Sequence, residues 1–235
     1  LALTLLHRWN SLCTIILSKG RIILKTGSVM LKDIGYKALK LITEPAVNGL
    51  WVDSIQGLKN IPRDTGAILI ANHASYLDFI ILGSIVENTV GRPLYFWANS
   101  KVCNHPVFKY YAKSFKSIEI DYDKPSNAFW KESIEKLRNN QLICIFPEGT
   151  RTRTGRLNEF NSGYLRLAKI TNSVIVPIVI NGTFKILPPH RKTPALKKCK
   201  VIVYEAIQIP TISSKHDLFA LNEAIHSKYY RSNLR

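Results

Sequence analysis

From residue 51 onward, short apolar runs alternate with segments whose apolar residues recur at helical spacing. The apolar runs predict strands at 51–55, 67–71, 93–97, 117–120, 142–146, 174–180 and 201–209. Helices are expected at 75–86, 126–139, 162–171 and 217–229. Several of the runs are apolar throughout, which is typical of strands buried on both faces of a parallel sheet. The alternation therefore predicts an α/β fold, with a mostly parallel sheet flanked by helices.

The first 45 residues follow a different pattern. One apolar stripe at helical spacing consists of Leu5, Trp9, Leu12 and Ile16. A second helical pattern runs over 29–42, so we expect an N-terminal helical hairpin at 1–45, followed by the α/β domain at 46–235. The chain has no run of 18 uncharged apolar residues, and it therefore predicts no membrane-spanning helix.

The net charge of the chain indicates which classes of partner it could bind. The chain carries 33 Lys and Arg against 16 Asp and Glu, a net charge of +17. Such a surface attracts nucleic acid, anionic lipid headgroups or phosphorylated small molecules. The bases are spread along the chain and no recognised nucleic-acid-binding motif is present, so we expect no nucleic-acid partner. For residues 1–45, two interpretations remain: a hairpin packed on the domain, or a basic amphipathic segment for membrane association.

The cysteines indicate the redox environment. Cys13, Cys103, Cys144 and Cys199 lie far apart, with no C-x-x-C pair and no His at metal-ligand spacing. We therefore expect neither a disulfide framework nor a metal site, and a reducing cytosolic environment fits best.

A first candidate for chemistry is the segment 70–79, Ile-Ala-Asn-His-Ala-Ser-Tyr-Leu-Asp-Phe, which follows a predicted strand. His73 and Asp78 would lie about 140° apart on an ideal helix, so they meet only if the chain turns between them. Ser75 is a natural helix cap that places Asp78 in the first turn, behind His73. A carboxylate there would hold one imidazole nitrogen and leave the other as a base. The alternative is a capping box alone, with His73 an incidental turn residue.

A second candidate is the segment 145–155, Ile-Phe-Pro-Glu-Gly-Thr-Arg-Thr-Arg-Thr-Gly. Gly149 permits a tight turn whose N–H groups face an anion, and the guanidinium of Arg151 matches phosphate oxygens. Glu148 would position Arg151 or a substrate hydroxyl. The alternative is a polar loop with solvated charges. Both candidate segments leave the carboxyl ends of predicted strands, where open α/β sheets bind ligands.

In this order and spacing, the two motifs at 72–78 and 146–151 resemble the glycerolipid acyltransferase family, the bacterial 1-acylglycerol-3-phosphate acyltransferases of the PlsC type. Segments 57–62, 160–163 and 175–178 are similar to other conserved blocks of that family. The resemblance covers roughly residues 50 to 185.

The resemblance implies an O-acyltransferase of phospholipid biosynthesis. A fatty acyl group would pass from acyl-CoA or acyl carrier protein to the free hydroxyl of a lysophospholipid, and 1-acylglycerol-3-phosphate would give phosphatidic acid. His73 would be the general base and Asp78 would orient it. The implied substrate-binding residues are Asn72, Glu148, Gly149, Thr150 and Arg151. No cofactor or metal is implied, since the thioester is a co-substrate, and we expect association with the anionic cytoplasmic face of a membrane.

The chain departs from the family pattern in several blocks: Lys109 stands where Gly is usual, and Asn161 and Ser162 stand where a basic residue is usual. Where an Ile-Asp-Arg sequence is usual, it has Ile120-Asp121-Tyr122. The missing Arg leaves another lysophospholipid, such as lysophosphatidylethanolamine, as an alternative acceptor. A non-catalytic lipid-binding module with the same fold is a further alternative.

Overall fold

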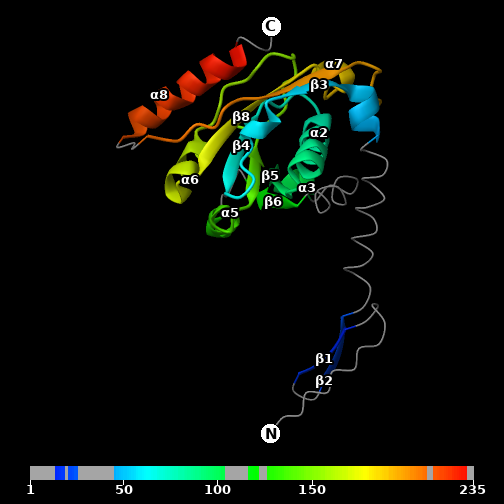
Figure 1. The fold of residues 1–235 in the computed structure, drawn as a ribbon, viewed down its shortest axis with the longest axis vertical. Coiled ribbons are helices and arrows are strands. Elements are labelled where there is room, and N and C mark those ends of the chain that lie inside the picture. Colours follow the sequence, from blue (N-terminus) through cyan, green and yellow to red (C-terminus); the bar gives the residue numbers. More distant parts are fainter. Residues whose placement is uncertain are drawn as a thin grey trace. The chain divides into compact units, whose positions relative to one another are not determined.

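The computed structural model describes residues 14–18, 21–25, 45–103, 116–121, 126–210 and 214–231 (Figure 1). The chain divides into two units, Leu1–Ile42 and Thr43–Arg235.

The first unit contains an antiparallel pair of strands, β1 (Thr14–Ser18) and β2 (Arg21–Lys25). Ile16, the last member of the expected helical stripe, pairs with Ile23, so the helix prediction is wrong at β1. Thr-Ile-Ile and Arg-Ile-Ile are rich in β-branched side chains, which favour a pleated surface, and two residues separate the strands, as in a tight hairpin. Leu5, Trp9, Leu12 and the pattern at 29–42 lie outside the described residues.

The second unit is built on a seven-stranded sheet with the order β3-β9-β8-β4-β7-β5-β6. Its strands are β3 (Val52–Gln56), β4 (Ala67–Ala71), β5 (Leu94–Asn99), β6 (Ser117–Ile120), β7 (Leu142–Ile145), β8 (Val174–Asn181) and β9 (Cys199–Val203). All neighbouring strands are parallel except β8 and β9, which are antiparallel. The predicted mostly parallel sheet is therefore confirmed.

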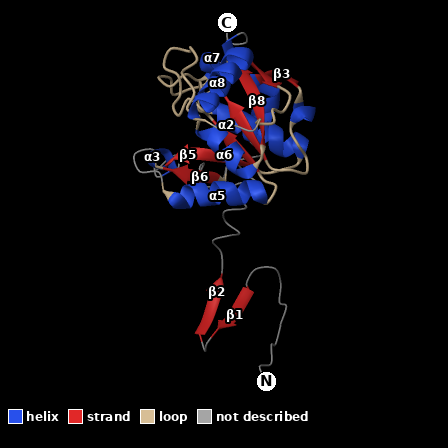
Figure 2. Cartoon of the chain, turned by 90° about the vertical axis from the view of Figure 1, so that its left-hand side faces the viewer, coloured by secondary structure: helices blue, strands red, loops and turns tan. Residues whose placement is uncertain are grey.

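Helices cover both faces of this sheet (Figure 1, Figure 2). The α-helices are α2 (Leu77–Ile85), α3 (Ser100–Cys103), α5 (Asn127–Arg138), α6 (Gly163–Thr171), α7 (Thr183–Ile186) and α8 (Lys215–Ile225). Short π-helical segments occupy Ala46–Trp51, Val86–Val90 and His226–Arg231, and a 3₁₀ turn occupies Leu58–Asn60.

Strand β4 lies between two hydrophobic cores, one on each face of the sheet. All five of its residues are buried, because β7 and β8 pair with its two edges and helices cover both of its faces. Leu69 packs in one core with α2, whereas Ile68 and Ile70 pack in the other with α6 and α8. Side chains alternate between faces along a strand, so a continuous apolar run is what a central strand needs.

The last predicted strand needs a correction. The sequence predicts 201–209, whereas β9 ends at Val203, and Ile207 then forms one isolated antiparallel bridge with Ile175. The prediction extends too far because apolar residues recur beyond Val203, although among the described residues 204–210 only Ile207 forms a β-bridge with β8, and it does so outside β9. Within the described ranges, every helix is too short or too polar to cross a bilayer.

Candidate active site

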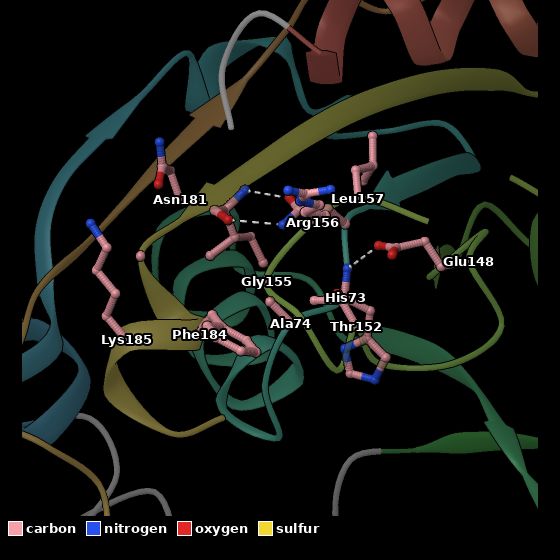
Figure 3. Close-up of a pocket in the computed structure, with 13 residues that line it drawn as sticks. His73, Ala74, Glu148, Thr152, Gly155, Arg156, Leu157, Asn181, Phe184 and Lys185 are labelled. Atoms are coloured by element: carbon pink, nitrogen blue, oxygen red, sulfur yellow. Dashed lines mark hydrogen bonds between the residues drawn. The ribbon is translucent and has the colours of Figure 1, made fainter. Parts of the chain in front are cut away.

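The two candidate motifs meet because their strands are neighbours. His73 follows β4 and Glu148 follows β7, and these strands run parallel and side by side. Residues after parallel strands emerge at one edge of the sheet, so the loops lie together there. Figure 3 shows the resulting close-up, in which the Glu148 side chain reaches the backbone of His73.

The structure brings His73 and Asp78 together, as the predicted turn requires. Nδ1 of His73 lies 2.9 Å from Oδ2 of Asp78. The same oxygen accepts hydrogen bonds from the backbone N–H groups of Ala74 at 2.7 Å and Ser75 at 2.8 Å. Asp78 is fully buried. Three donors thus converge on one carboxylate oxygen, and they fix both the carboxylate and the imidazole that it holds.

The His73 ring has a second support. It stacks on the ring of Phe146, with centroids 4.1 Å apart and planes at 17°. When Nδ1–H donates to a carboxylate, the neutral imidazole carries its lone pair on Nε2. The side chain remains 17% exposed, enough for a substrate to reach it. The site therefore holds an oriented imidazole whose Nε2 is suited to accept a proton.

Ser75 acts as a helix cap. Helix α2 begins at Leu77, but Tyr76 already has helical backbone angles, and the Ser75 hydroxyl accepts a hydrogen bond from the Leu77 N–H at 3.1 Å. The hydroxyl also donates to the carbonyl of Leu187 at 2.7 Å. Since both the donor and an acceptor position of the hydroxyl are used, capping accounts for this serine without a nucleophilic role.

Glu148 differs from the sequence expectation. Its Oε1 accepts a hydrogen bond from the His73 N–H at 2.6 Å, and its Oε2 accepts one from the Asn158 N–H at 3.0 Å. In the structure these two backbone donors, and not the guanidinium of Arg151, bind the carboxylate. Burial raises the pKa of the Glu148 carboxyl to about 7, although both N–H donors favour the ionised form.

The backbone of His73 is thus held entirely by the second motif. Its N–H donates to Glu148, and its carbonyl accepts from the Thr152 N–H at 2.9 Å. The turn at 148–152 therefore fixes the position and orientation of the His73 backbone. Sequence reasoning did not find Thr152 or Asn158, because a backbone donor leaves no signal in the residue type.

Gly149 and Arg151 shape the exposed side of the second motif. Gly149 has φ +69°, a left-handed conformation that glycine adopts readily, and its N–H bonds to the carbonyl of Phe146 at 3.0 Å. The guanidinium of Arg151 lies 3.3 Å from the centroid of the Tyr76 ring. Its Nη1 is buried and has no hydrogen-bond partner among the described residues. The face of the Tyr76 ring is therefore the contact that the structure shows for this guanidinium. Thr150 is exposed beside it.

Asn72 joins two strands at the edge of the site. Its amide nitrogen donates to the carbonyl of Ile180 at 2.9 Å, and its amide oxygen accepts from the N–H of the same residue at 2.7 Å. The side chain is buried. The pair of bonds clamps the end of β4 to β8.

A hollow of about 150 Å³ lies beside the His73 turn. Figure 3 shows Asn181 and Lys185 on one side of it, with His73 and Glu148 on the other. Sequence reasoning did not select Lys185, because nothing in the motif at 145–155 points to α7. Within the described ranges, no group of three His, Cys, Asp or Glu side chains is placed to hold a metal ion.

Comparison with known proteins bears on this arrangement. The family model described as Acyltransferase matches residues 54–181, which include β4, β7, β8 and the whole His73–Asp78 turn. The chain belongs to this acyltransferase family. The matched region also contains the 146–151 motif, so both candidate segments lie inside the family domain.

Other acyltransferases of the family are similar over the same part of the chain. A chloroplastic 1-acyl-sn-glycerol-3-phosphate acyltransferase of Arabidopsis thaliana is 31% identical over 138 residues, covering 57% of this chain and 37% of that protein. A 1-acyl-sn-glycerol-3-phosphate acyltransferase of Cocos nucifera is 37% identical over 126 residues, covering 51% and 39%. The chain thus spans about two fifths of the length of these plant relatives.

Bacterial acyltransferases match over a larger share of their length. The 1-acyl-sn-glycerol-3-phosphate acyltransferase of Bacillus subtilis is 24% identical over 173 residues, which cover 72% of this chain and 82% of that protein. The crystal structure of the 1-acyl-sn-glycerophosphate acyltransferase PlsC of Thermotoga maritima superposes with a TM-score of 0.64 at 23% identity, covering 88% of this chain and 82% of that chain. This likeness confirms the α/β acyltransferase fold.

Proposed function

We propose that this chain is a 1-acylglycerol-3-phosphate O-acyltransferase, which converts lysophosphatidic acid to phosphatidic acid. The observation that carries the proposal is the His73 imidazole, whose Nδ1 is held 2.9 Å from the buried Asp78 carboxylate. The names of the plant and bacterial relatives support the choice of acceptor.

In the proposed reaction, Nε2 of His73 takes the proton from the free hydroxyl of the acceptor as that oxygen attacks the thioester carbonyl. The new C–O bond forms and the C–S bond breaks. The departing thiolate then takes the proton from the imidazolium, so the base is regenerated. An alcohol is a poor nucleophile near neutral pH, and removing its proton during attack is what a positioned imidazole supplies. Asp78 stabilises the imidazolium, as the carboxylate does in catalytic triads.

The other residues of the two motifs take supporting parts in this proposal. Arg151 binds the acceptor phosphate together with the exposed turn at Gly149 and Thr150. Glu148 and Asn72 position the His73 turn through their bonds to backbone groups. Their effect on the substrate is therefore indirect.

Replacing Arg151 with alanine is expected to raise the KM for lysophosphatidic acid by about tenfold or more, because one charge-assisted hydrogen bond is lost. The KM for the acyl donor should change little. Arg151→Lys should restore only part of the affinity, since an ammonium neither binds phosphate in a fork nor lies flat on Tyr76. Steady-state kinetics with each substrate varied in turn measures both values.

The matched control is Arg138→Ala, which removes an exposed arginine at the end of α5. It should leave both KM values unchanged. Equal increases in the KM of donor and acceptor for Arg151→Ala would show that Arg151 does not bind the acceptor.

The acceptor is tested with a panel of lysophospholipids and one acyl-CoA. We expect lysophosphatidic acid to be converted to phosphatidic acid with the highest kcat/KM. Tyr122 stands where the family usually has Arg, so lysophosphatidylethanolamine is the second candidate acceptor. A higher kcat/KM for that lipid would replace the proposed acceptor, and no turnover with any acceptor would favour a non-catalytic lipid-binding module.

The acyl donor and the place of action complete the proposal. The donor is acyl-CoA or acyl carrier protein, and the same assay with each thioester distinguishes them. We propose that the protein acts as a peripheral or monotopic protein on the cytoplasmic face of a membrane. A net charge of +17 and the basic, apolar segment at 1–45 support attachment to anionic lipid.

A further inference from the structure

The connection between α7 and β9 is unusually basic. Residues 188–198, here called the basic loop, read Pro-Pro-His-Arg-Lys-Thr-Pro-Ala-Leu-Lys-Lys and contain no Asp or Glu. Its four bases are Arg191, Lys192, Lys197 and Lys198, and all four are exposed. Within the described part of the chain, none of the four forms an ion pair. Their charge is therefore available to a partner.

One apolar side chain stands among these bases. Leu196 is 83% exposed, more than Phe219 on α8 at 64% or Leu50 at 50%. An isolated exposed leucine is ordinary on a protein surface, but this one has two lysines directly after it. An apolar residue with bases around it is the pattern of segments that enter the headgroup region of anionic bilayers.

Hydrogen bonds hold the loop in this arrangement. The Ala195 N–H donates to the carbonyl of Ile186 at 2.8 Å, and the Lys197 N–H donates to the carbonyl of Ala195 at 2.9 Å. At the start of the loop, the Arg191 N–H donates to the carbonyl of Pro188 at 3.0 Å. The exposure of Leu196 is thus a property of a bonded loop.

Both ends of the basic loop contact the candidate active site. Leu187, directly before it, accepts the hydrogen bond of the Ser75 hydroxyl in the His73 turn. At the other end, the carbonyl of Lys198 packs against Gly182, which lines the hollow, and a Cβ on that glycine would come within 2.6 Å of the carbonyl. An external surface bound to the basic loop would therefore lie next to the candidate active site.

We propose that the basic loop docks the protein on an anionic lipid bilayer. Leu196 enters the boundary between headgroups and acyl chains, and the four bases contact acidic headgroups. The proposal rests on the proposed function for its purpose, because a lipid acceptor and a lipid product then enter and leave the site next to the bilayer. Charge alone would suit an acidic carrier protein equally, but the nearly complete exposure of Leu196 favours an apolar phase.

The test is cosedimentation of the full chain with phosphatidylcholine vesicles that contain or lack phosphatidylglycerol. We expect Lys197→Glu combined with Lys198→Glu to weaken binding to anionic vesicles about tenfold or more at low salt. This loss should shrink at high salt, because salt screens the charges. Leu196→Ser should weaken binding several-fold at both salt concentrations, since burial of an apolar side chain does not depend on charge.

The matched control is Phe219→Ser, which removes an exposed apolar side chain from α8, a helix that packs against the opposite core from α2 and α7. It should bind vesicles as the unchanged chain does. Loop variants should also keep the unchanged kcat with a short-chain, water-soluble acceptor, which shows that the site is intact.

Vesicle binding of the loop variants equal to that of the unchanged chain would overturn the proposal. So would a loss of acyl transfer from acyl carrier protein without a loss of vesicle binding, which would assign the loop to that protein. Binding is measured without substrate, so failure of the acyltransferase proposal would appear only in the activity assay, and the two failures are distinguishable.

Discussion

Replacing His73 with alanine is expected to lower kcat by two or more orders of magnitude, because general-base catalysis contributes about 10²–10⁴-fold. The fold should survive, since the bonds that hold this turn join the backbone of His73 to Glu148 and Thr152, and alanine keeps both. Turnover of lysophosphatidic acid measures the first effect. The thermal unfolding midpoint measures the second.

His216→Ala provides the control, because His216 is an exposed histidine on α8. Its turnover should equal that of the unchanged chain. Near-normal turnover of His73→Ala, with both substrates saturating, would rule out the proposed mechanism.

Replacing Asp78 with asparagine is expected to lower kcat by about 10³–10⁴-fold, by analogy with the carboxylate of catalytic triads. An amide oxygen in the place of Oδ2 still accepts from the N–H groups of Ala74 and Ser75. A neutral amide does not stabilise the imidazolium. The amide nitrogen would take the place of Oδ1, which has no partner among the described residues, so stability should also fall, by on the order of 1–3 kcal/mol.

Two further variants separate charge from structure at this position. Asp78→Ala removes the acceptor of three donors and should lower the unfolding midpoint more than Asp78→Asn does. Asp53→Asn, a half-exposed aspartate on β3, should change neither turnover nor stability much. Turnover of Asp78→Asn close to that of the unchanged chain would show that His73 works without a charged partner.

The sequence predicts best the bounds of strands whose hydrophobic pattern fits only one secondary structure. For β4 and β6 the predicted bounds agree with the structure, because Gly66 and Asn72 flank the apolar run of β4, and Lys116 and Asp121 flank the alternating run of β6. The direction of β9 was not predictable, since an apolar run looks the same in parallel and antiparallel strands. Its orientation depends on the connection after β8, where proline residues and a four-residue helix replace a long crossover helix.

The N-terminal segment shows the opposite case. Ile16 fits a four-residue apolar spacing with Leu12, and it equally fits the short β-branched run at 14–16. Five residues are too few to separate the two periods by pattern alone. Pairing with Ile23 on a neighbouring strand decides between them, and that contact is not visible in either segment by itself.

Within the site, the sequence predicted which side chains take part better than it predicted their hydrogen-bond partners. The contact between His73 and Asp78 was predictable, because a serine cap fixes where the helix starts. The bonds of Glu148 to the N–H groups of His73 and Asn158 were not, since any residue type supplies such a donor. The stack of Arg151 on Tyr76 joins two loops, and local pattern carries no information about it.

The two backbone bonds of His73 also have a consequence for folding. They join residues 75 or more positions apart, and the Asn72 clamp spans 108 positions. Contacts this distant form only after long loops close, which makes them slow relative to helix formation. The helices alone therefore build no catalytic centre. During refolding, enzymatic activity should return with the pairing of β4, β7 and β8, later than the recovery of helical content.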